Sequence, residues 1–323
     1  MEKKHDLIGI GECLVEFNHN GSGDYQLGYS GDVLNALSAA GKLGLRTGLI
    51  SAIGNDPFSE GLLGILDEER IDLSHAPVLE GKPNGIYFIS LDAMGIPTFH
   101  FLRKYSAARD MFEVQPLASL VDYVRSSRAL LFSSIPLAVM HDREKFFELL
   151  EAVKGDAIIA FDLNVRPVLW KDLSELNKVI DRIAPLADVL FVTNEDDTHL
   201  FGSRPSHDTV KDYAGRGYGE IALRRGGAHT LVKCSEGEFE VPVPHVQKII
   251  DSTGAGDAFD AGYIAAMLRG LPTYECASLG NAAAAATLET RGGRATGLTI
   301  ERVEKLYRPL VKWGTFHVPV RHA

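Results

Sequence analysis

The sequence predicts an α/β fold in which helices cover both faces of a mainly parallel central sheet. Short apolar runs typical of buried strands alternate along the chain with amphipathic segments typical of helices. This alternation indicates βαβ units, in which a helix connects two parallel strands. A length of 323 residues with a hydrophobic fraction of 45% suits one large α/β domain or two smaller ones.

Each element is predicted from its local pattern. Buried strands are expected at residues 7–11, 47–54, 129–134, 157–164, 188–194 and 220–226. Helices are expected at residues 34–43, 59–69, 142–153, 176–186, 209–214, 255–268, 273–288 and 300–310. Gly270 with Pro272, and later the pair Gly292-Gly293, are stop signals that follow two of the last three helices.

Two segments, 13–30 and 84–104, alternate apolar and polar residues between turn residues instead. The second predicts a β-hairpin in which IYFISL and TFHFLR flank a turn around Asp92–Pro97. Two arrangements fit this pattern equally well. The segments form either a small β-sheet that stands off the main body or edge strands that extend the main sheet.

Composition and charge argue against several functional classes. The formal net charge of -10 argues against non-specific binding to nucleic acid or to an anionic membrane. Three cysteines, Cys13, Cys234 and Cys276, lie far apart without metal-ligand spacing, which favours reduced buried thiols. The N-terminus lacks the apolar core of a signal peptide, and no apolar run approaches the roughly 18 residues of a membrane span. We therefore expect a soluble, cytoplasmic protein.

Several common catalytic motifs are absent from the sequence. It has no GxxxxGK[ST] phosphate loop, no HExxH zinc motif and no GxSxG nucleophile elbow. The stretch GIGECL has Leu14 where a dinucleotide-binding fingerprint needs its third glycine. Hydrolase, zinc-enzyme and dehydrogenase interpretations are therefore not favoured.

The stretch IIDSTGAGDAFDAGY, residues 249–263, predicts a Gly-rich turn that leads into a helix. Backbone N–H groups at the start of a helix lack intrahelical partners, so a turn at residues 253–256 could hold a phosphate. Asp257 falls in the first turn of this helix, beside any anion bound there. The same residues also fit an ordinary tight turn in which Asp257 only complements the helix dipole.

A second stretch, GYSGDVLNALSAAGKLG at 28–44, also starts a helix after a glycine, Gly31. Asp32 and Asn35 lie one helical turn apart and point the same way, so they could bind a polyhydroxylated ligand through hydrogen bonds. Taken alone, Asp32 is also a favourable residue for a helix N-terminus.

At these two stretches the sequence resembles the ribokinase-like (PfkB) family of sugar kinases, and the resemblance covers nearly the whole chain. IDSTGAGDAFDAGY is similar to the C-terminal signature D-T-x-G-A-G-D-x-F-x-x-G, with Asp251 and Asp257 at the expected spacing. GYSGDVLNALSAAGKLG with the following GNDPFSEG is similar to the N-terminal signature, although Ser30 replaces the first glycine of its G-G pair.

The resemblance implies a three-layer α/β/α fold with a mainly parallel central sheet and a small β-sheet lid. Residues 1–12, 31–83 and 105–323 would form the nucleotide- and substrate-binding core, and residues 13–30 and 84–104 the lid. Members of the family often form dimers through the lid, so a homodimer is expected here as well.

The resemblance also implies the chemistry of the site. Asp257 would act as general base on the terminal hydroxyl of a sugar, while the N–H groups of Gly254, Ala255 and Gly256 form an anion hole for the transferred phosphoryl group. ATP would be the phosphoryl donor, bound with Mg²⁺. The nucleotide-binding residues implied are Asn194, Arg224, Gly226, Gly254, Gly256, Asn281 and Ala285.

Two carboxylates are implied as cation sites. Asp197 stands where the N-x-x-E motif of the family has Glu, and it would contact Mg²⁺ through water. Asp251 would serve a monovalent cation such as K⁺, which some members of the family use.

Three further stretches resemble the 2-keto-3-deoxygluconate kinases of this family, namely IGECLVEF, the hairpin at 84–109, and FDLNVRPVLW at 161–170. Arg166 follows a predicted buried strand at the sheet edge where α/β proteins bind ligands, and its guanidinium suits a carboxylate. Arg103 would be the second clamp residue, and Phe101 stands where relatives can have Tyr. The substrate-binding residues implied are Gly31, Asp32, Asn35, Tyr87, Phe101, Arg103 and Arg166.

The expected function is therefore an ATP-dependent kinase that phosphorylates an acidic keto sugar, 2-keto-3-deoxygluconate, at its terminal hydroxyl. One alternative is a fructokinase- or ribokinase-like enzyme for a neutral sugar. Another, of a different class, is a sugar-binding regulatory protein without catalytic activity. We expect no nucleic-acid or membrane partner.

Overall fold

A computed structural model describes residues 3–19, 23–91 and 97–311. Its strands are β1 (His5–Ile10), β2 (Leu14–His19), β3 (Tyr25–Ser30), β4 (Thr47–Ile50), β5 (Ile53–Gly54), β6 (Asp72–His75), β7 (Val78–Leu79), β8 (Gly85–Leu91), β9 (Pro97–Leu102), β10 (Ser127–Ser133), β11 (Ile158–Asp162), β12 (Val189–Thr193), β13 (Glu220–Arg224), β14 (Thr230–Cys234) and β15 (Gly237–Val241). Its α-helices are α1 (Asp32–Lys42), α2 (Ser59–Glu68), α3 (Leu117–Arg125), α4 (Ser134–Val139), α5 (Arg143–Val153), α6 (Leu173–Ile183), α7 (Asn194–Phe201), α8 (Ser206–Arg216), α9 (Ala255–Met267), α10 (Thr273–Thr287) and α11 (Ile300–Tyr307).

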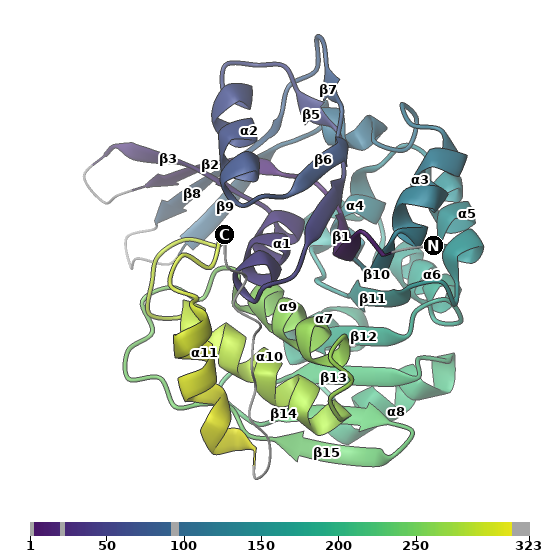
Figure 1. The fold of residues 1–323 in the computed structure, drawn as a ribbon, viewed down its shortest axis with the longest axis vertical. Coiled ribbons are helices and arrows are strands. Elements are labelled where there is room, and N and C mark those ends of the chain that lie inside the picture. Colours follow the sequence, from purple (N-terminus) through teal and green to yellow (C-terminus); the bar gives the residue numbers. More distant parts are fainter. Residues whose placement is uncertain (1–2, 20–22, 92–96, 312–323) are drawn as a thin grey trace.

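The central sheet has nine strands in the order β15-β14-β13-β12-β11-β10-β1-β4-β6 (Figure 1). Every pairing from β6 to β13 is parallel, whereas β14 pairs antiparallel with both β13 and β15 at one edge. The predicted α/β class with a mainly parallel sheet is confirmed. Because parallel strands carry their carboxyl ends at one edge, the loops after β1, β10, β11, β12 and β13 meet on the same side.

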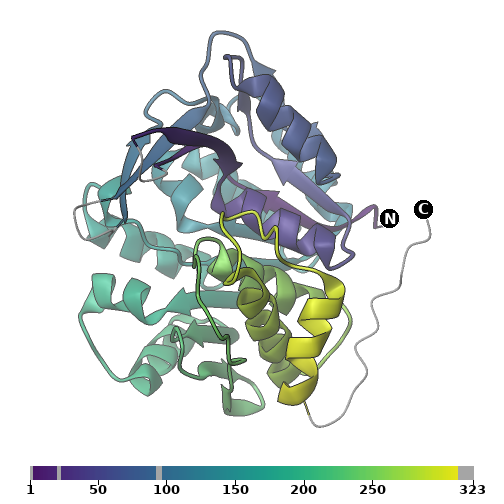
Figure 2. The same ribbon diagram turned by 90° about the vertical axis from the view of Figure 1, so that its left-hand side faces the viewer.

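Helices cover both faces of this sheet, as the two perpendicular views show (Figures 1 and 2). Leu7 of β1 packs in the core shared with α1, α9 and α10, while its neighbour Ile8 packs in the core shared with α3, α5, α6 and α8. Successive side chains of a strand point to opposite faces, so each strand stabilises both layers. Each fully buried Leu or Ile contributes roughly 1.5–3 kcal/mol. Among the described helices, none is long and apolar enough to cross a membrane.

A separate four-stranded sheet, in the order β3-β2-β8-β9, projects beside the central sheet (Figure 1). It is formed by the two segments with alternating pattern, and β8 and β9 pair antiparallel as the hairpin prediction requires. The small sheet is thus confirmed over the edge-strand alternative. Residues 92–96 of the expected turn lie outside the described residues. The division of the chain into a core and a lid subdomain stays a prediction.

Candidate active site

The two glycine-rich helix starts meet at Asp257. Its carboxylate Oδ2 accepts a 2.8 Å hydrogen bond from Nδ2 of Asn35, so the first turn of α9 contacts the first turn of α1. Ser30 donates to Oδ1 of Asn35 at 3.3 Å, which fixes the amide with its nitrogen toward Asp257. The serine that departs from the G-G signature therefore has a role in orienting this pair.

The surroundings of Asp257 favour its protonated form. Loss of hydration within the protein, followed by the negative charges of Asp32 and Asp162, raises the pKa of Asp257 to about 8. The hydrogen bond from Asn35 and the positive charge of Arg224 act in the opposite direction. A carboxylate with a pKa near the working pH is suited to accept a proton during a reaction.

Four carboxylates, that of Asp257 among them, line one small cavity. Asp32, Asp162, Asp257 and Asp260 all line a cavity of about 10 Å³, close to the size of a single water molecule. Asp32 accepts a short hydrogen bond from the hydroxyl of Ser133 at the end of β10. The cavity thus lies where the carboxyl ends of the strands meet the first turns of α1 and α9.

Gly254 provides the sharp turn at the start of α9. Its φ is 77°, in the left-handed region, and an added Cβ would lie 2.2 Å from the carbonyl oxygen of Gly293. The N–H of Ala255 donates to the carbonyl of Ser252 at 3.2 Å, so the predicted anion-hole donor at this position is already engaged. The N–H groups of Gly256 and Asp257 follow it in the first turn, where a helix offers no intrahelical acceptor.

Gly31 plays the corresponding part at the start of α1. Its φ is 135°, and an added Cβ would lie 2.5 Å from the carbonyl oxygen of Glu12. No other residue type fits this position without moving the backbone. Asp32 and Asn35 are thereby held at the sheet edge beside Asp257.

Arg224, predicted to contact the nucleotide, is engaged inside the protein. Its guanidinium donates to Asp162 at 2.6 Å, to Asp260 at 2.9 Å and to the carbonyl of Gly256 at 3.0 Å. Burial raises the pKa of Asp162 and that of Asp260, and the charge of Arg224 opposes the increase in both. The contacts that the structure shows for Arg224 are thus with α9 and β11, and its predicted contact with nucleotide stays a prediction.

One face of the small sheet carries a second polar pair. Tyr87 of β8 donates a short hydrogen bond to the carboxylate of Glu16, which stands opposite it on β2. The ring of Tyr87 stacks on that of Phe101, with centroids 5.6 Å apart. Sequence reasoning missed Glu16, although the alternation in CLVEF and the register with Tyr87 place both on one face. Burial raises the pKa of Glu16, and the hydrogen bond from Tyr87 opposes the increase.

The two clamp arginines have different environments. Arg103 is buried and its Nη2 lies 2.5 Å from the carboxylate of Glu12, so a charge of the protein already balances it. Arg166 is exposed four residues beyond the end of β11, and its Nη1 donates to the adjacent carbonyl of Val165 at 3.0 Å. Arg166 therefore keeps a guanidinium edge accessible to a ligand.

Asn281, also predicted to bind nucleotide, has a structural role. Its Oδ1 accepts from Thr230 at 2.7 Å, and its Nδ2 donates to the carbonyl of Pro242 at 3.1 Å. The amide thus joins α10 to β14 and to the segment after β15, and the predicted contact of Asn281 with nucleotide stays a prediction. Ala285 is buried on the same helix, and Gly226 follows β13 with a φ of 62° and open space where a Cβ would be added.

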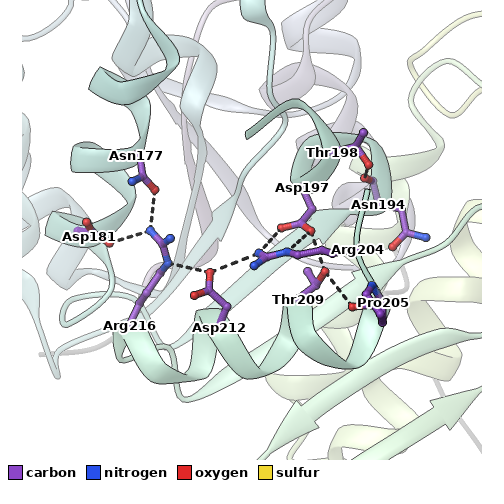
Figure 3. Close-up of polar contacts among 10 residues, drawn as sticks. All are labelled: Asn177, Asp181, Asn194, Asp197, Thr198, Arg204, Pro205, Thr209, Asp212 and Arg216. Carbon is purple, nitrogen blue, oxygen red and sulfur yellow. Dashed lines mark hydrogen bonds and ion pairs between the residues drawn. The ribbon is translucent and has the colours of Figure 1, made fainter. Parts of the chain in front are cut away.

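Asp197 is held by an ion pair with Arg204 (Figure 3). Arg204 donates to both of its oxygens at 2.7 and 2.6 Å, and Thr209 donates to one of them at 2.7 Å. Figure 3 shows the carboxylate facing Arg204 and α8, while Asn194 begins the same helix, α7. These donors engage both carboxylate oxygens and disfavour direct coordination of a metal ion by Asp197, whereas its predicted contact with Mg²⁺ through water stays a prediction.

Asp251 ties two loops together. It accepts from the N–H of Thr253 at 2.9 Å and from the N–H of Gly292 at 2.9 Å. Burial would raise the pKa of Asp251, but these hydrogen bonds outweigh it and hold the pKa below its usual value. The carboxylate is therefore ionised and joins the signature loop to the loop after α10.

A family model described as "pfkB family carbohydrate kinase" matches residues 4–300 of the chain. The chain belongs to the PfkB family of carbohydrate kinases. The 2-dehydro-3-deoxygluconokinase of Escherichia coli K12 is 32% identical over 303 residues, which cover 90% of this chain and 97% of that protein. The protein of the same name from Dickeya dadantii is 29% identical, with 88% and 94% covered. The chain is thus a sugar kinase of this family.

Solved structures show the same fold. A sugar kinase of Pyrococcus horikoshii is 28% identical with a TM-score of 0.79, covering 94% of this chain and 99% of that chain. A protein described as a putative ribokinase II from E. coli, in complex with ATP and magnesium, has a TM-score of 0.82 at 22% identity, with 94% and 99% covered. The predicted ribokinase-like architecture is confirmed.

In this PfkB kinase the structure brings together residues that sequence analysis assigned to catalysis and to sugar binding. Gly31, Asp32, Asn35, Gly254 and Asp257 meet at one point of the sheet edge. Ser133, Asp162 and Asp260, which sequence analysis did not single out, complete the surroundings of the carboxylate. Asp162 had a usable signal, because it ends a buried strand at the ligand-binding edge.

Proposed function

We propose that this kinase transfers the γ-phosphoryl group of ATP to the terminal hydroxyl of 2-keto-3-deoxygluconate. The acceptor is supported by relatives named 2-dehydro-3-deoxygluconokinase at 27–32% identity, another name for the kinase of this sugar acid. The structural observation that carries the choice of an acidic sugar is Arg166, an exposed guanidinium four residues beyond the end of β11. Arg103 contributes less to this choice, since Glu12 lies against it.

Asp257 is the proposed general base. It accepts the proton of the sugar hydroxyl as the hydroxyl oxygen attacks the γ-phosphorus and ADP leaves. The N–H groups of Gly254, Gly256 and Asp257 at the start of α9, with the positive end of the helix dipole, stabilise charge on the transferred oxygens. Little covalent chemistry is required of the protein, because phosphoryl transfer depends mainly on positioning and charge neutralisation.

The nucleotide side of the site is proposed from Asn194, Gly226 and Ala285. A solved complex of the Pyrococcus horikoshii sugar kinase with ATP, 27% identical to this chain, supports ATP as the donor. We propose that Mg²⁺ is carried by the ATP phosphates, because Asp197 is engaged with Arg204. A monovalent cation near Asp251 belongs to the same proposal, and activity in KCl compared with choline chloride tests it.

A homodimer formed through the small sheet is proposed as well. Its outer strands expose large apolar side chains, including Tyr25, Leu27, Phe99 and Leu102. Leu27→Asp should convert a dimer into a monomer in analytical ultracentrifugation, whereas a wild-type monomer would contradict the proposal. A cytoplasmic location, where ATP is supplied, completes it.

The test of the acceptor is an enzyme-linked ATP-consumption screen with 2-keto-3-deoxygluconate, fructose and ribose. We expect turnover of the sugar acid to be strongly preferred. Arg166→Ala should raise the KM for the sugar acid about tenfold or more while leaving the KM for ATP nearly unchanged. Equal activity on all three sugars would show that no carboxylate is recognised.

A kinase for a neutral sugar is the second candidate, and a specific contact favours it. The buried pair of Arg103 with Glu12 removes one of the two charges that a sugar acid would use. A preference for fructose or ribose in the same screen, with Arg166→Ala without effect on the sugar KM, would establish this alternative. Asp257→Asn should then still abolish most of the activity.

A further inference from the structure

A buried ion triad lies under the first turn of α9. It consists of Arg224 at the end of β13, Asp162 at the end of β11 and Asp260 on α9 itself. The side chain of Asp162 is 6% exposed, that of Arg224 is 11% exposed and that of Asp260 is 2% exposed. The carboxyl ends of two strands are thereby joined to the helix that carries the proposed base.

The contacts of Arg224 bracket Asp257 along α9. One nitrogen, Nη1, donates both to the carbonyl of Gly256, one residue before Asp257, and to Asp260, three residues after it. The other terminal nitrogen, Nη2, donates to Asp162. A planar guanidinium can donate to all three acceptors at once, whereas an ammonium group is a point charge on a flexible stem. An added Cβ on Gly256 would lie 3.0 Å from Nη1, so the helix approaches the guanidinium closely.

We propose that Asp162, Arg224 and Asp260 act as a positioning triad that fixes the first turn of α9 against the sheet and balances the charge around Asp257. The proposal rests on the proposed function, in which Asp257 is the general base. None of the three side chains has to touch the sugar or the nucleotide. Their effect is transmitted through the place and the protonation state of Asp257.

The charged groups around Asp257 come from every element that packs against it. Asp32 comes from α1, Asp162 from β11, Arg224 from β13 and Asp260 from α9. On the side of the small sheet, the charge of Asp257 acts on Tyr87. The charge of Asp162 raises the pKa of Asp257, and that of Arg224 lowers it. Removal of the Asp162 charge alone should therefore favour the ionised base.

The first experiment is the pH profile of kcat/KM for Asp162→Asn. Asn is isosteric with Asp and leaves the contacts of Arg224 with Asp260 and Gly256 in place. We expect the acidic limb of the profile to move to lower pH by about one unit, because one negative charge near the base is lost. The assay uses ATP with 2-keto-3-deoxygluconate, or with the neutral sugar turned over fastest in the screen.

The second experiment is Arg224→Lys, which keeps the positive charge but removes the planar guanidinium with its several fixed N–H donors. We expect kcat to fall roughly 10- to 100-fold because the first turn of α9 loses part of its anchoring. The KM for ATP should change less than about threefold, since Arg224 contacts the helix rather than the nucleotide. Arg204→Lys is the matched control, because Arg204 also binds a buried carboxylate through two nitrogens but contacts Asp197 and Asp212 instead of α9. This control should leave the pH profile in place.

Each outcome either supports the triad or overturns it. An unshifted acidic limb in Asp162→Asn, a wild-type kcat in Arg224→Lys, or the same kcat loss in the Arg204→Lys control would overturn it. A raised KM for ATP at unchanged kcat in Arg224→Lys would return that residue to nucleotide binding. The proposed function fails separately, namely if wild type phosphorylates no sugar in the screen or if Asp257→Asn is fully active.

Discussion

Asn35 and Asp257, 222 positions apart in the chain, are joined by a 2.8 Å hydrogen bond from amide to carboxylate. The bond joins the first turns of α1 and α9, whose local sequence patterns also fitted ordinary turns. It also restricts the rotamer of Asp257, because the carboxylate is held on one side by α1. A base fixed in this manner needs little reorganisation when a substrate hydroxyl arrives.

The rate should follow the titration of Asp257. With a pKa of about 8, only the ionised fraction accepts a proton, so kcat/KM should fall about tenfold per pH unit below pH 8. Asn35→Ala should move this limb to still higher pH, because the hydrogen bond from Asn35 lowers the pKa of Asp257. Initial rates between pH 6 and 9 check both expectations. A profile that is flat down to pH 6 would contradict the assignment of the base.

Asp257→Asn should stabilise the protein while it removes activity. The pKa of about 8 in the folded protein lies above the ordinary aspartate value of 3.8. Between about pH 4 and 8 the carboxyl therefore ionises in the unfolded chain but not in the folded protein, which is progressively destabilised as the pH rises. Asn does not titrate, and the variant should gain roughly 2–5 kcal/mol over wild type at pH 8 but little at pH 4. Urea unfolding at these two pH values measures the difference. An equal gain in the free energy of unfolding at both pH values would argue against a raised pKa of Asp257.

At Gly254, the steric effect of an added Cβ can be distinguished from the cost of a positive φ by comparison with Gly81. Gly254 and Gly81 have nearly equal φ values, 77° and 72°, but only at Gly254 would a Cβ meet an atom, the oxygen of Gly293 at 2.2 Å. Gly81→Ala should cost about 1–2 kcal/mol and keep kcat. Gly254→Ala should cost more and lower kcat at least about tenfold, because the first turn of α9 must move. Equal effects of the two changes on kcat would mean that the contact with Gly293 is unimportant for catalysis.

Local periodicity was sufficient for most of the fold. The strands and the helices at both signature stretches are confirmed because their apolar spacing repeats over several residues. The helix α7 was not predicted, since it is short and carries three acidic residues in its first turn, and its start depends on a capping box between Thr193 and Asp196. The antiparallel strands β14 and β15 were also missed, because polar residues interrupt their apolar pattern.

Residue spacing did not predict the surroundings of the two arginines at the site. Arg224 ends β13 and Arg166 lies in the loop after β11, at the same edge of the sheet. The side chain of Arg166 is nevertheless exposed, whereas that of Arg224 is only 11% exposed. The difference arises from Asp162 and Asp260, which are 62 and 36 residues from Arg224 in the chain. A polar residue type indicates that a partner is needed, whereas only the folded structure shows whether the protein or a ligand provides it.

Asn281→Ala should reduce stability rather than nucleotide affinity. The variant leaves Thr230 without its buried acceptor and the Pro242 carbonyl without one donor, which should cost about 1–3 kcal/mol. The KM for ATP should remain within about twofold of wild type if folding is maintained. Thr230→Val is a matched control that removes the same hydrogen bond from the other side. A large rise in the KM for ATP confined to Asn281→Ala would restore the predicted nucleotide contact.

Tyr87→Phe should weaken binding of the sugar, because it removes the hydrogen bond between Tyr87 and Glu16. The change removes the hydroxyl that donates to the Glu16 carboxylate and leaves a buried acid without this donor, at a cost of about 1–3 kcal/mol. Glu16→Gln retains an acceptor for Tyr87 and carries no charge, so Tyr87→Phe should cost less in that background. Unfolding free energies and the KM for the sugar, measured for both single variants and the double variant, give the coupling directly. The coupling should increase with pH, because the hydrogen bond from Tyr87 favours the ionised form of Glu16. Additive effects at every pH would show that the two side chains act independently and that Glu16 does not help to orient Tyr87 toward the sugar.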